Sequence, residues 1–197
     1  LAGASFQALL RNPLADPHLL GVSAGGAFGV VVGSGFLMAG SLTFSIPALS
    51  LIGSLVAVMV VYRLSLRKGS LSLYTLLLVG VMLNSLFISS IVFFQSLIRS
   101  DELMTVLFWL LGNLSFTNYS RILLVLALLG LASIPLLFQA RRLNLLSLGE
   151  STAHSLGVSV EGTKKFVFFL AALLTGTAVS VSGMIGFVGL VVPHLTR

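Results

Sequence analysis

Uncharged runs separated by short charged loops give the chain its pattern. No Asp, Glu, Lys or Arg occurs in residues 19–62, 70–98, 103–120, 122–140 or 166–196. A helix needs about 20 apolar residues to cross the hydrocarbon layer of a membrane. The first run therefore has room for two such helices and most of the others for one, which predicts an all-α polytopic membrane protein.

The charges also indicate where the helices begin and end. We expect a first helix to end near Leu10, followed by spans at 19–39, 46–62, 71–98, 119–140 and 166–192. That makes about six transmembrane helices. The apolar piece 103–111 is too short to cross and is followed by Gly112 and Asn113, so we expect it to be interfacial or re-entrant.

Composition supports the membrane assignment and narrows the chemistry. The chain is 57% hydrophobic and 8% charged, whereas soluble domains carry about 25% charged residues. Its net charge of +6 would suggest nucleic acid as a partner of a soluble protein, but basic residues beside membrane helices set topology instead. The absence of cysteine excludes disulfides, thiolate metal ligands and cysteine nucleophiles.

The basic residues are distributed unevenly between alternate loops. One set of loops, 11–18, 63–70 and 141–165, carries eight of them: Arg11, Arg63, Arg67, Lys68, Arg141, Arg142, Lys164 and Lys165. The other set carries three: Arg99, Arg121 and Arg197. Because loops rich in Lys and Arg stay in the cytoplasm, we place 11–18, 63–70 and 141–165 on the cytoplasmic side.

Four glycines at positions 21, 25, 29 and 33 recur every fourth residue. On one helix, Gly21, Gly25, Gly29 and Gly33 would share a face and let a neighbouring helix approach closely in lipid. The same spacing weakens a helix in water by about 1 kcal/mol per glycine relative to alanine. The stretch lacks the order of a phosphate-binding loop. Helix packing is therefore the main interpretation, and lining of a transport pathway is the alternative.

Few side chains suggest chemistry. Asn84 and Ser180 lie at membrane depth, where polar groups make interhelical hydrogen bonds or line a water-filled path. Glu150 and His154 would share a helix face, but a third metal ligand is lacking nearby, so a solvated pair is favoured over a metal site. No serine-nucleophile motif accompanies the many serines. The sequence thus predicts neither an enzyme nor a cofactor or metal.

The polar stretch 141–165 is the main piece outside the spans. Its leucines, with Ala153, Leu156 and Val158, predict a short amphipathic helix that ends at Gly157. Such a helix between basic residues suits docking to a cytoplasmic partner. A simple interfacial connector is the alternative that the residues alone leave open.

Three blocks of the chain resemble the FecCD-type permeases, the membrane subunits of type II ABC importers for iron-siderophores, haem and vitamin B12. The blocks are QALLRNPLADPHLLGVSAGGAFG at 7–29, LNLLSLGESTAHSLGV at 143–158 and SGMIGFVGLVVPHLTR at 182–197. The resemblance implies the second to seventh of about ten helices. Since Leu1 falls inside an apolar helix, we expect the chain to be an internal piece of a longer protein.

The resemblance also implies roles for particular residues. The loop 141–165 would form paired coupling helices that sit in a groove of the ATPase. Its pattern LGE-x-x-A-x-x-LG falls on Leu148, Gly149, Glu150, Ala153, Leu156 and Gly157. The cytoplasmic turn would contain Asn12, Pro13, Asp16 and Pro17. The cytoplasmic gate would lie around 70–75, where Leu73 and Tyr74 replace the small polar residues of related permeases. Docking of a binding protein would fall to Arg99, Arg121 and Arg197.

As a whole, the resemblance implies a transport subunit of a bacterial inner membrane. It would pair with a second, identical or different permease subunit and receive its chelate from an extracytoplasmic binding protein. Two partner ATPase subunits would hydrolyse the ATP, and lipid would surround the dimer. A passive channel or a membrane-embedded enzyme is the rival interpretation. The sequence does not indicate which chelate is carried.

Overall fold

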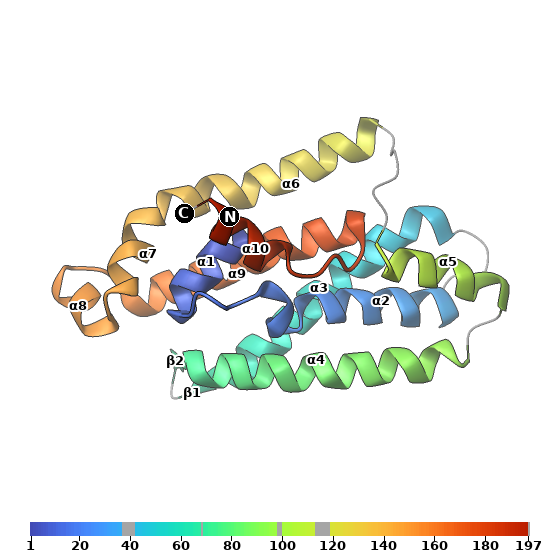
Figure 1. Cartoon of the computed structure of the whole chain (residues 1–197), viewed down its shortest axis with the longest axis horizontal. Helices are drawn as coiled ribbons and strands as arrows, with labels where there is room; N and C mark the ends of the chain where they lie inside the picture. Colours follow the sequence, from blue (N-terminus) through green and yellow to red (C-terminus); the bar gives the residue numbers. More distant parts are fainter. Residues whose placement is uncertain (37–41, 68, 98–99, 113–118, 197) are drawn as a thin grey trace.

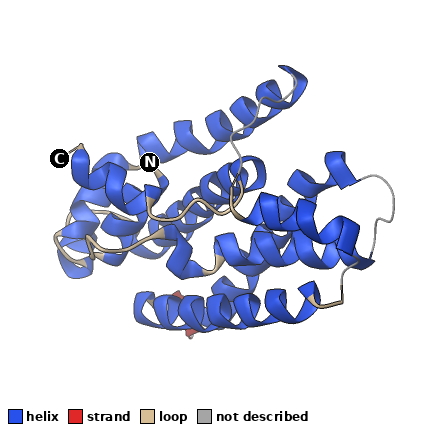
Figure 2. Cartoon of the chain, turned by 45° about the vertical axis from the view of Figure 1, so that its right-hand side comes forward, coloured by secondary structure: helices blue, strands red, loops and turns tan. Residues whose placement is uncertain are grey.

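The structure, a computed structural model, describes the chain apart from residues 37–41, 68, 98–99, 113–118 and 197 (Figure 1). Helices make up nearly all of what is described (Figure 2). In chain order the elements are α1 (Ala2–Leu10), η1 (Pro17–Leu20), α2 (Val22–Phe36), α3 (Leu42–Ser65), β1 (Leu66–Arg67), β2 (Ser70–Leu71), α4 (Leu73–Gln95), α5 (Ser100–Leu110), α6 (Tyr119–Phe138), α7 (Ala140–Ser147), α8 (Glu150–Ser155), α9 (Val160–Ser182) and α10 (Val188–Leu195).

The prediction of an all-α membrane protein is confirmed. Within the described residues, three helical stretches are long and apolar enough to cross a membrane: Ile46–Ser65, Leu73–Gln95 and Val160–Ser182. Ile122–Phe138 and Ala140–Ser147 form a fourth candidate, bent by 55°. The described residues therefore contain three or four of the about six spans expected, since α1 has 9 residues and α2 has 15. The short apolar piece that we expected to be interfacial or re-entrant forms α5, a helix of 11 residues.

Both predicted ends of the last span are wrong. The last span does not run through to residue 192, because α9 ends at Ser182 and Gly183 takes a left-handed conformation (φ 75°). A Cβ at Gly183 would overlap the carbonyl oxygen of Trp109, so the turn is packed against α5. At its other end, α9 starts six residues before Phe166, which places Lys164 and Lys165 on the helix instead of in the loop.

The core is centred on α9. Over the most apolar 18-residue window, 56% of α9 is buried, against 17% of α4. Phe168 of α9 packs edge-on against Phe6 of α1 with ring centroids 6.2 Å apart, and stacks on Tyr62 of α3 at 6.4 Å. Both α1 and α3 are thus held against the same central helix.

Glycines allow α2 to approach α3 without intervening side chains. A Cβ at Gly25 would overlap that of Ala57, and one at Gly33 would lie 2.5 Å from Leu49 Cδ2. Gly29 lies against Gly53, so two backbones meet directly. Gly21 differs, because it precedes α2 in a left-handed conformation and lies beside Gly80 of α4. The four glycines therefore do not share one helix face.

Replacing Gly29 by valine should destabilise the protein. A Cβ there would lie 2.6 Å from the carbonyl oxygen of Leu49 and 2.9 Å from the Cα of Gly53, and neither backbone atom can move independently. Overpacking of this kind costs about 1–3 kcal/mol. We expect a lower melting temperature for Gly29→Val in detergent.

The matched control is Gly130→Val on α6, where no described atom lies within 4 Å of the added Cβ. Equal melting temperatures for the two variants would contradict the close α2–α3 contact.

Candidate functional site

The segment after α6 forms two short helices, α7 and α8, where the residue pattern alone predicted one. Leu143 and Leu146 of α7 are buried, and Leu146 packs with Ala153 of α8 and Val158 in a small apolar cluster. Gly149 separates the helices in a conformation with φ 129°, which L-residues with a Cβ rarely adopt. The single amphipathic helix predicted from the residues alone is therefore wrong because of this glycine, whereas the paired helices implied by the family resemblance agree with α7 and α8.

The end of α8 agrees with the sequence pattern. Gly157 has φ 80°, and its N–H donates to the His154 carbonyl at 3.0 Å. Val158 N–H donates to the Ala153 carbonyl at 3.0 Å, so the chain turns back onto α7. Two leucines of the motif stay outside this small core: Leu148 is 68% exposed and Leu156 is 59% exposed.

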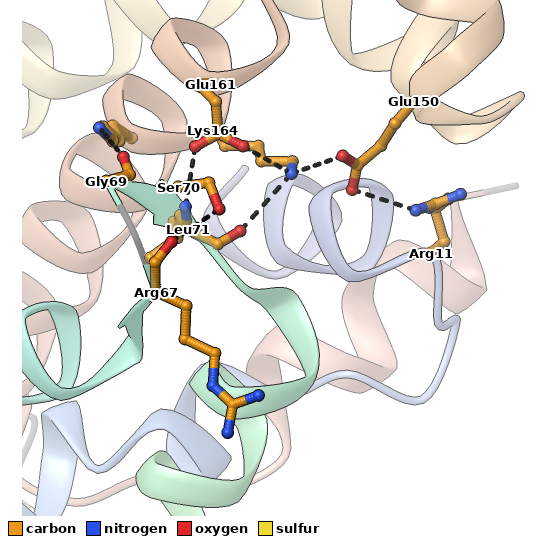
Figure 3. A network of polar contacts seen from close by, with 9 residues as sticks. Arg11, Arg67, Gly69, Ser70, Leu71, Glu150, Glu161 and Lys164 are labelled. Atoms are coloured by element: carbon orange, nitrogen blue, oxygen red, sulfur yellow. Dashed lines mark hydrogen bonds and ion pairs between the residues drawn. The ribbon is translucent and has the colours of Figure 1, made fainter.

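The carboxylate of Glu150 joins two segments that are distant in sequence (Figure 3). Its Oε2 accepts a hydrogen bond from Lys164 Nζ at 2.6 Å, and its Oε1 accepts one from Arg11 at 3.3 Å. Lys164 Nζ also donates to Glu161 Oε1 at 3.0 Å. The side chain of Lys164 is 4% exposed, while the two glutamates are 39% and 38% exposed. The ammonium is thus the buried centre of the cluster.

The cluster extends to the residue that precedes α4. Leu71 N–H donates to Glu161 Oε2 at 2.8 Å, and the Leu71 carbonyl accepts from Lys164 Nζ at 3.5 Å. The next residue, Ser72, caps α4 by accepting from Thr75 N–H at 3.3 Å. We call Arg11, Glu150, Glu161, Lys164 and the Leu71 peptide the Lys164 cluster.

This cluster joins the three loops that the distribution of basic residues assigned to one side of the membrane. Arg11 follows α1, Leu71 belongs to the β1–β2 hairpin, and Glu150 begins α8 (Figure 1). Leu66 pairs with Leu71 and Arg67 with Ser70 in that antiparallel hairpin. The three loops therefore lie at one end of the molecule.

The turn between α1 and α2 is held by its own side chains. Asn12 Oδ1 accepts from Leu14 N–H at 2.9 Å, and the buried Asp16 caps η1 by accepting from His18 N–H at 3.0 Å. Pro13 follows Asn12, and Pro17 starts η1 with its ring against Gly189 of α10. The side chains of Asn12 and Asp16, each directly before a proline, therefore hold the turn in place through hydrogen bonds.

The turn also reaches into the helix bundle. A Cβ at Gly80 would lie 2.7 Å from the Leu19 carbonyl oxygen, and Gly80 lies about 10 Å along α4 from its first residue at a rise of ~1.5 Å per residue. The span expected from residue 19 therefore starts with η1, which lies beside α4 about two helical turns from the first residue of α4.

The remaining predicted residues are dispersed. At the start of α4, Leu73 is partly buried and Tyr74 is 80% exposed. Farther along, Asn84 is partly buried. Ser180 is buried and donates to the carbonyl of Thr177 in its own helix at 2.8 Å. Arg99 and Arg197 lie outside the described residues, as does the side chain of Arg121 in α6.

Within the described part of the chain, no group of three His, Cys, Asp or Glu side chains could hold a metal ion. The Glu150 carboxylate, considered above as a ligand together with His154, instead binds two cationic side chains. Sequence reasoning missed Lys164, which was counted as a basic loop residue. The spacing of Glu161 and Lys164, three apart on one helix, was the available signal.

Comparison with known proteins identifies the family. The sequence profile of the FecCD transport family matches residues 1–197. The chain belongs to this family.

Individual relatives agree with this assignment. The chain is 43% identical over 202 residues to YvrB of Bacillus subtilis (strain 168), an ABC transporter permease protein, and 40% identical over 206 residues to the hemin transport system permease HmuU of Yersinia pestis. All of the chain is covered, against 56% and 60% of the relatives. A solved inward-facing structure, described as a metal-chelate type ABC transporter, matches all of the chain and 62% of its own with a TM-score of 0.89 and 33% identity. The chain thus spans little more than half the length of these relatives.

The small core of α7 and α8 should depend on Leu146. Leu146 is 3% exposed, and truncating a buried leucine to alanine costs about 2–5 kcal/mol. We expect Leu146→Ala to make the protein in detergent more susceptible to trypsin at Arg141 and Arg142. Leu148→Ala makes the same truncation at an exposed site and should leave cleavage unchanged. Equal cleavage of both variants would contradict the packing described here.

Proposed function

We propose that the chain is the membrane-spanning part of an ABC importer permease that carries an iron-siderophore, haem or cobalamin-type chelate. ATP would be hydrolysed by a separate partner subunit, so this chain is not itself an enzyme. The observation that carries the proposal is the Lys164 cluster, which joins the start of α8 to three other segments at one end of a membrane protein. Membership of the FecCD family supports the same assignment.

The exposed leucines of the α7–α8 segment suit the proposed ATPase contact. Leu148 and Leu156 lie on either side of α8, and both expose more than half of their surface. Apolar side chains of this kind, at the centre of a contact, can insert into a groove of a partner protein. The carboxylate of Glu150, in contrast, contacts Lys164 and Arg11 in the Lys164 cluster. The segment thus has an outer apolar surface for a partner and an inner polar connection to the helix bundle.

The other proposed parts follow the family resemblance. The 70–75 segment with Leu73 and Tyr74 would form the cytoplasmic gate, and the turn with Asn12, Pro13, Asp16 and Pro17 would lie on the same side. A second permease subunit, two ATPase subunits and an extracytoplasmic binding protein would complete the importer, with Arg99, Arg121 and Arg197 facing the binding protein. The glycine-rich α2 supports helix packing in this proposal and does not line the path.

A passive channel or a membrane-embedded enzyme is a weaker alternative. An enzyme in the membrane needs ionisable groups clustered at membrane depth, whereas the ionic cluster described here lies at the ends of α1, α8 and α9 and beside the start of α4. A channel needs a filter built from a ring of carbonyls or charges, and the described segments contain no such motif. The arrangement favours transmission of movement between segments.

Uptake by the complete importer tests the function and its cargo. The full-length permease, its ATPase and its binding protein would be reconstituted in liposomes and offered ferric hydroxamate, ferric catecholate, haem and cobalamin. We expect ATP-dependent uptake of one class. Uptake without ATP would indicate a channel, and chemical conversion of the cargo would indicate an enzyme, so either result would contradict the proposal.

Glu150→Ala should uncouple ATP hydrolysis from uptake. The substitution removes both the Lys164 and the Arg11 contacts of α8, while the apolar packing of Ala153 against α7 stays. We expect normal amounts of protein in the membrane and uptake reduced about tenfold, in the usual range for a coupling between sites. His154→Ala, at an exposed position on the same helix, is the control. Unchanged uptake in Glu150→Ala would refute the coupling role.

A further inference from the structure

We propose that Lys164 is a positioning residue that joins the coupling helix α8 to the start of α4, so that the two segments move as one. The inference rests on the proposed importer function and adds to it a route from the ATPase contact to the cytoplasmic end of a membrane helix. Lys164 touches neither ATP nor cargo. Its role would be to transmit a displacement.

The first step is the environment of the ammonium group. Lysine has three N–H donors and no acceptor, and the structure supplies three acceptors: Glu150 Oε2 at 2.6 Å, Glu161 Oε1 at 3.0 Å and the Leu71 carbonyl at 3.5 Å. Each acceptor comes from a different part of the chain: the start of α8, the first turn of α9 and the residue before the α4 cap (Figure 3). One buried group therefore contacts all three.

The second step is the double attachment of Leu71. Its N–H donates to Glu161 Oε2 at 2.8 Å, and its carbonyl accepts from Lys164. The side chain of Leu71 is buried at 1% exposure. The backbone N–H and carbonyl of Leu71 are thus both bonded to α9, and its side chain is buried. Ser72, which caps α4, follows directly, so a displacement of Leu71 displaces the first turn of α4.

The third step is the charge balance. Lys164 and Arg11 carry two positive charges and Glu150 and Glu161 carry two negative ones, and they alternate along the chain of contacts. Separating Glu150 from the buried ammonium of Lys164 would leave that ammonium with the carboxylate of Glu161 alone, which is unfavourable. The start of α8 therefore cannot move away from α9 and Leu71 without breaking the balanced cluster, which favours joint movement over separation.

The neighbouring lysine supplies a contrast. Lys165 Nζ donates to the Gly69 carbonyl at 3.1 Å in an exposed bond. It carries the same charge, lies one residue along the same helix and contacts the same hairpin. The structure shows no contact of Lys165 with α8 among the described residues. Removing its charge alters the local charge without breaking the α8 connection.

The test uses the complete importer in liposomes, with ATP hydrolysis and uptake measured together. For Lys164→Met we expect ATP hydrolysis within about twofold of the wild type and uptake per ATP reduced about tenfold. Lys164→Arg, which keeps charge and donors, should restore most of the loss, and Lys165→Met should resemble the wild type. Wild-type uptake per ATP in Lys164→Met would overturn the inference. So would an equal fall of hydrolysis and uptake with loss of the assembled complex, since it would show that Lys164 only holds the fold.

A second measurement does not require Lys164→Met to fold. Spin labels would be placed at Ser151 on α8 and Tyr74 on α4, both exposed positions, on a cysteine-free background. In the wild type we expect the distance between the labels to stay the same with and without ATP, whereas in Glu161→Gln, which weakens the hold on Leu71, it should change on ATP binding. A change of equal size in the wild type would overturn the inference. If the wild-type importer shows no ATP-driven uptake, the proposed function falls as well; if it does, only the role of Lys164 is at stake.

Discussion

The buried ammonium of Lys164 sets the arrangement of one whole end of the molecule. A charge taken out of water costs several kcal/mol unless it is paired and hydrogen-bonded, and Lys164 is 4% exposed. The fold must therefore bring carboxylates to it, and they come from α8 and from the same turn of α9. The carboxylate of Glu150 then holds Arg11, and that of Glu161 holds Leu71. Three loops of unrelated sequence become one polar surface because a single charge needs partners.

The rest of the bundle depends on close approach of helices. In a membrane, lipid tails are as apolar as leucine, so helices associate through packing and hydrogen bonds instead of through the hydrophobic effect. Here Gly29 and Gly53 bring α2 and α3 into backbone contact, and aromatic rings join α1 and α3 to α9. The apolar side chains of α4 and α6 remain largely exposed, a surface suited to lipid or to further membrane helices. The bundle is thus closely packed at its centre and apolar on its outside.

In the proposed function, the α7–α8 segment contacts the partner and the Lys164 cluster connects this segment to the helix bundle. The leucines Leu148 and Leu156 of the α7–α8 segment are exposed, whereas the carboxylate of Glu150 is bonded to Lys164 and Arg11. In the proposed function, a partner protein that displaces the exposed leucines would also displace Glu150, and with it the residues that Glu150 contacts. The combination suits the proposed role of a permease that is driven by a separate subunit.

Much of the fold followed from pattern alone. The uncharged runs identified the membrane helices, since hydropathy and length decide which segments a bilayer accepts. The basic residues grouped the three loops that the structure places at one end. Helix boundaries were harder, because they depend on tertiary contacts: α9 ends where Gly183 packs on Trp109, and α8 is separate because Gly149 turns.

The candidate site shows the same division. Glu150, Ala153 and Gly157 were found from a local motif, and Glu161 with Lys164 could have been found from helical spacing. The pairing of Lys164 with Glu150 and with the Leu71 peptide could not, because residues 71, 150 and 164 approach one another only after α4, α8 and α9 have packed. Hydropathy along the chain determined which segments enter the membrane. Only the tertiary structure decided which charges meet, since an ion pair depends on distance in space and leaves no periodic trace in the sequence.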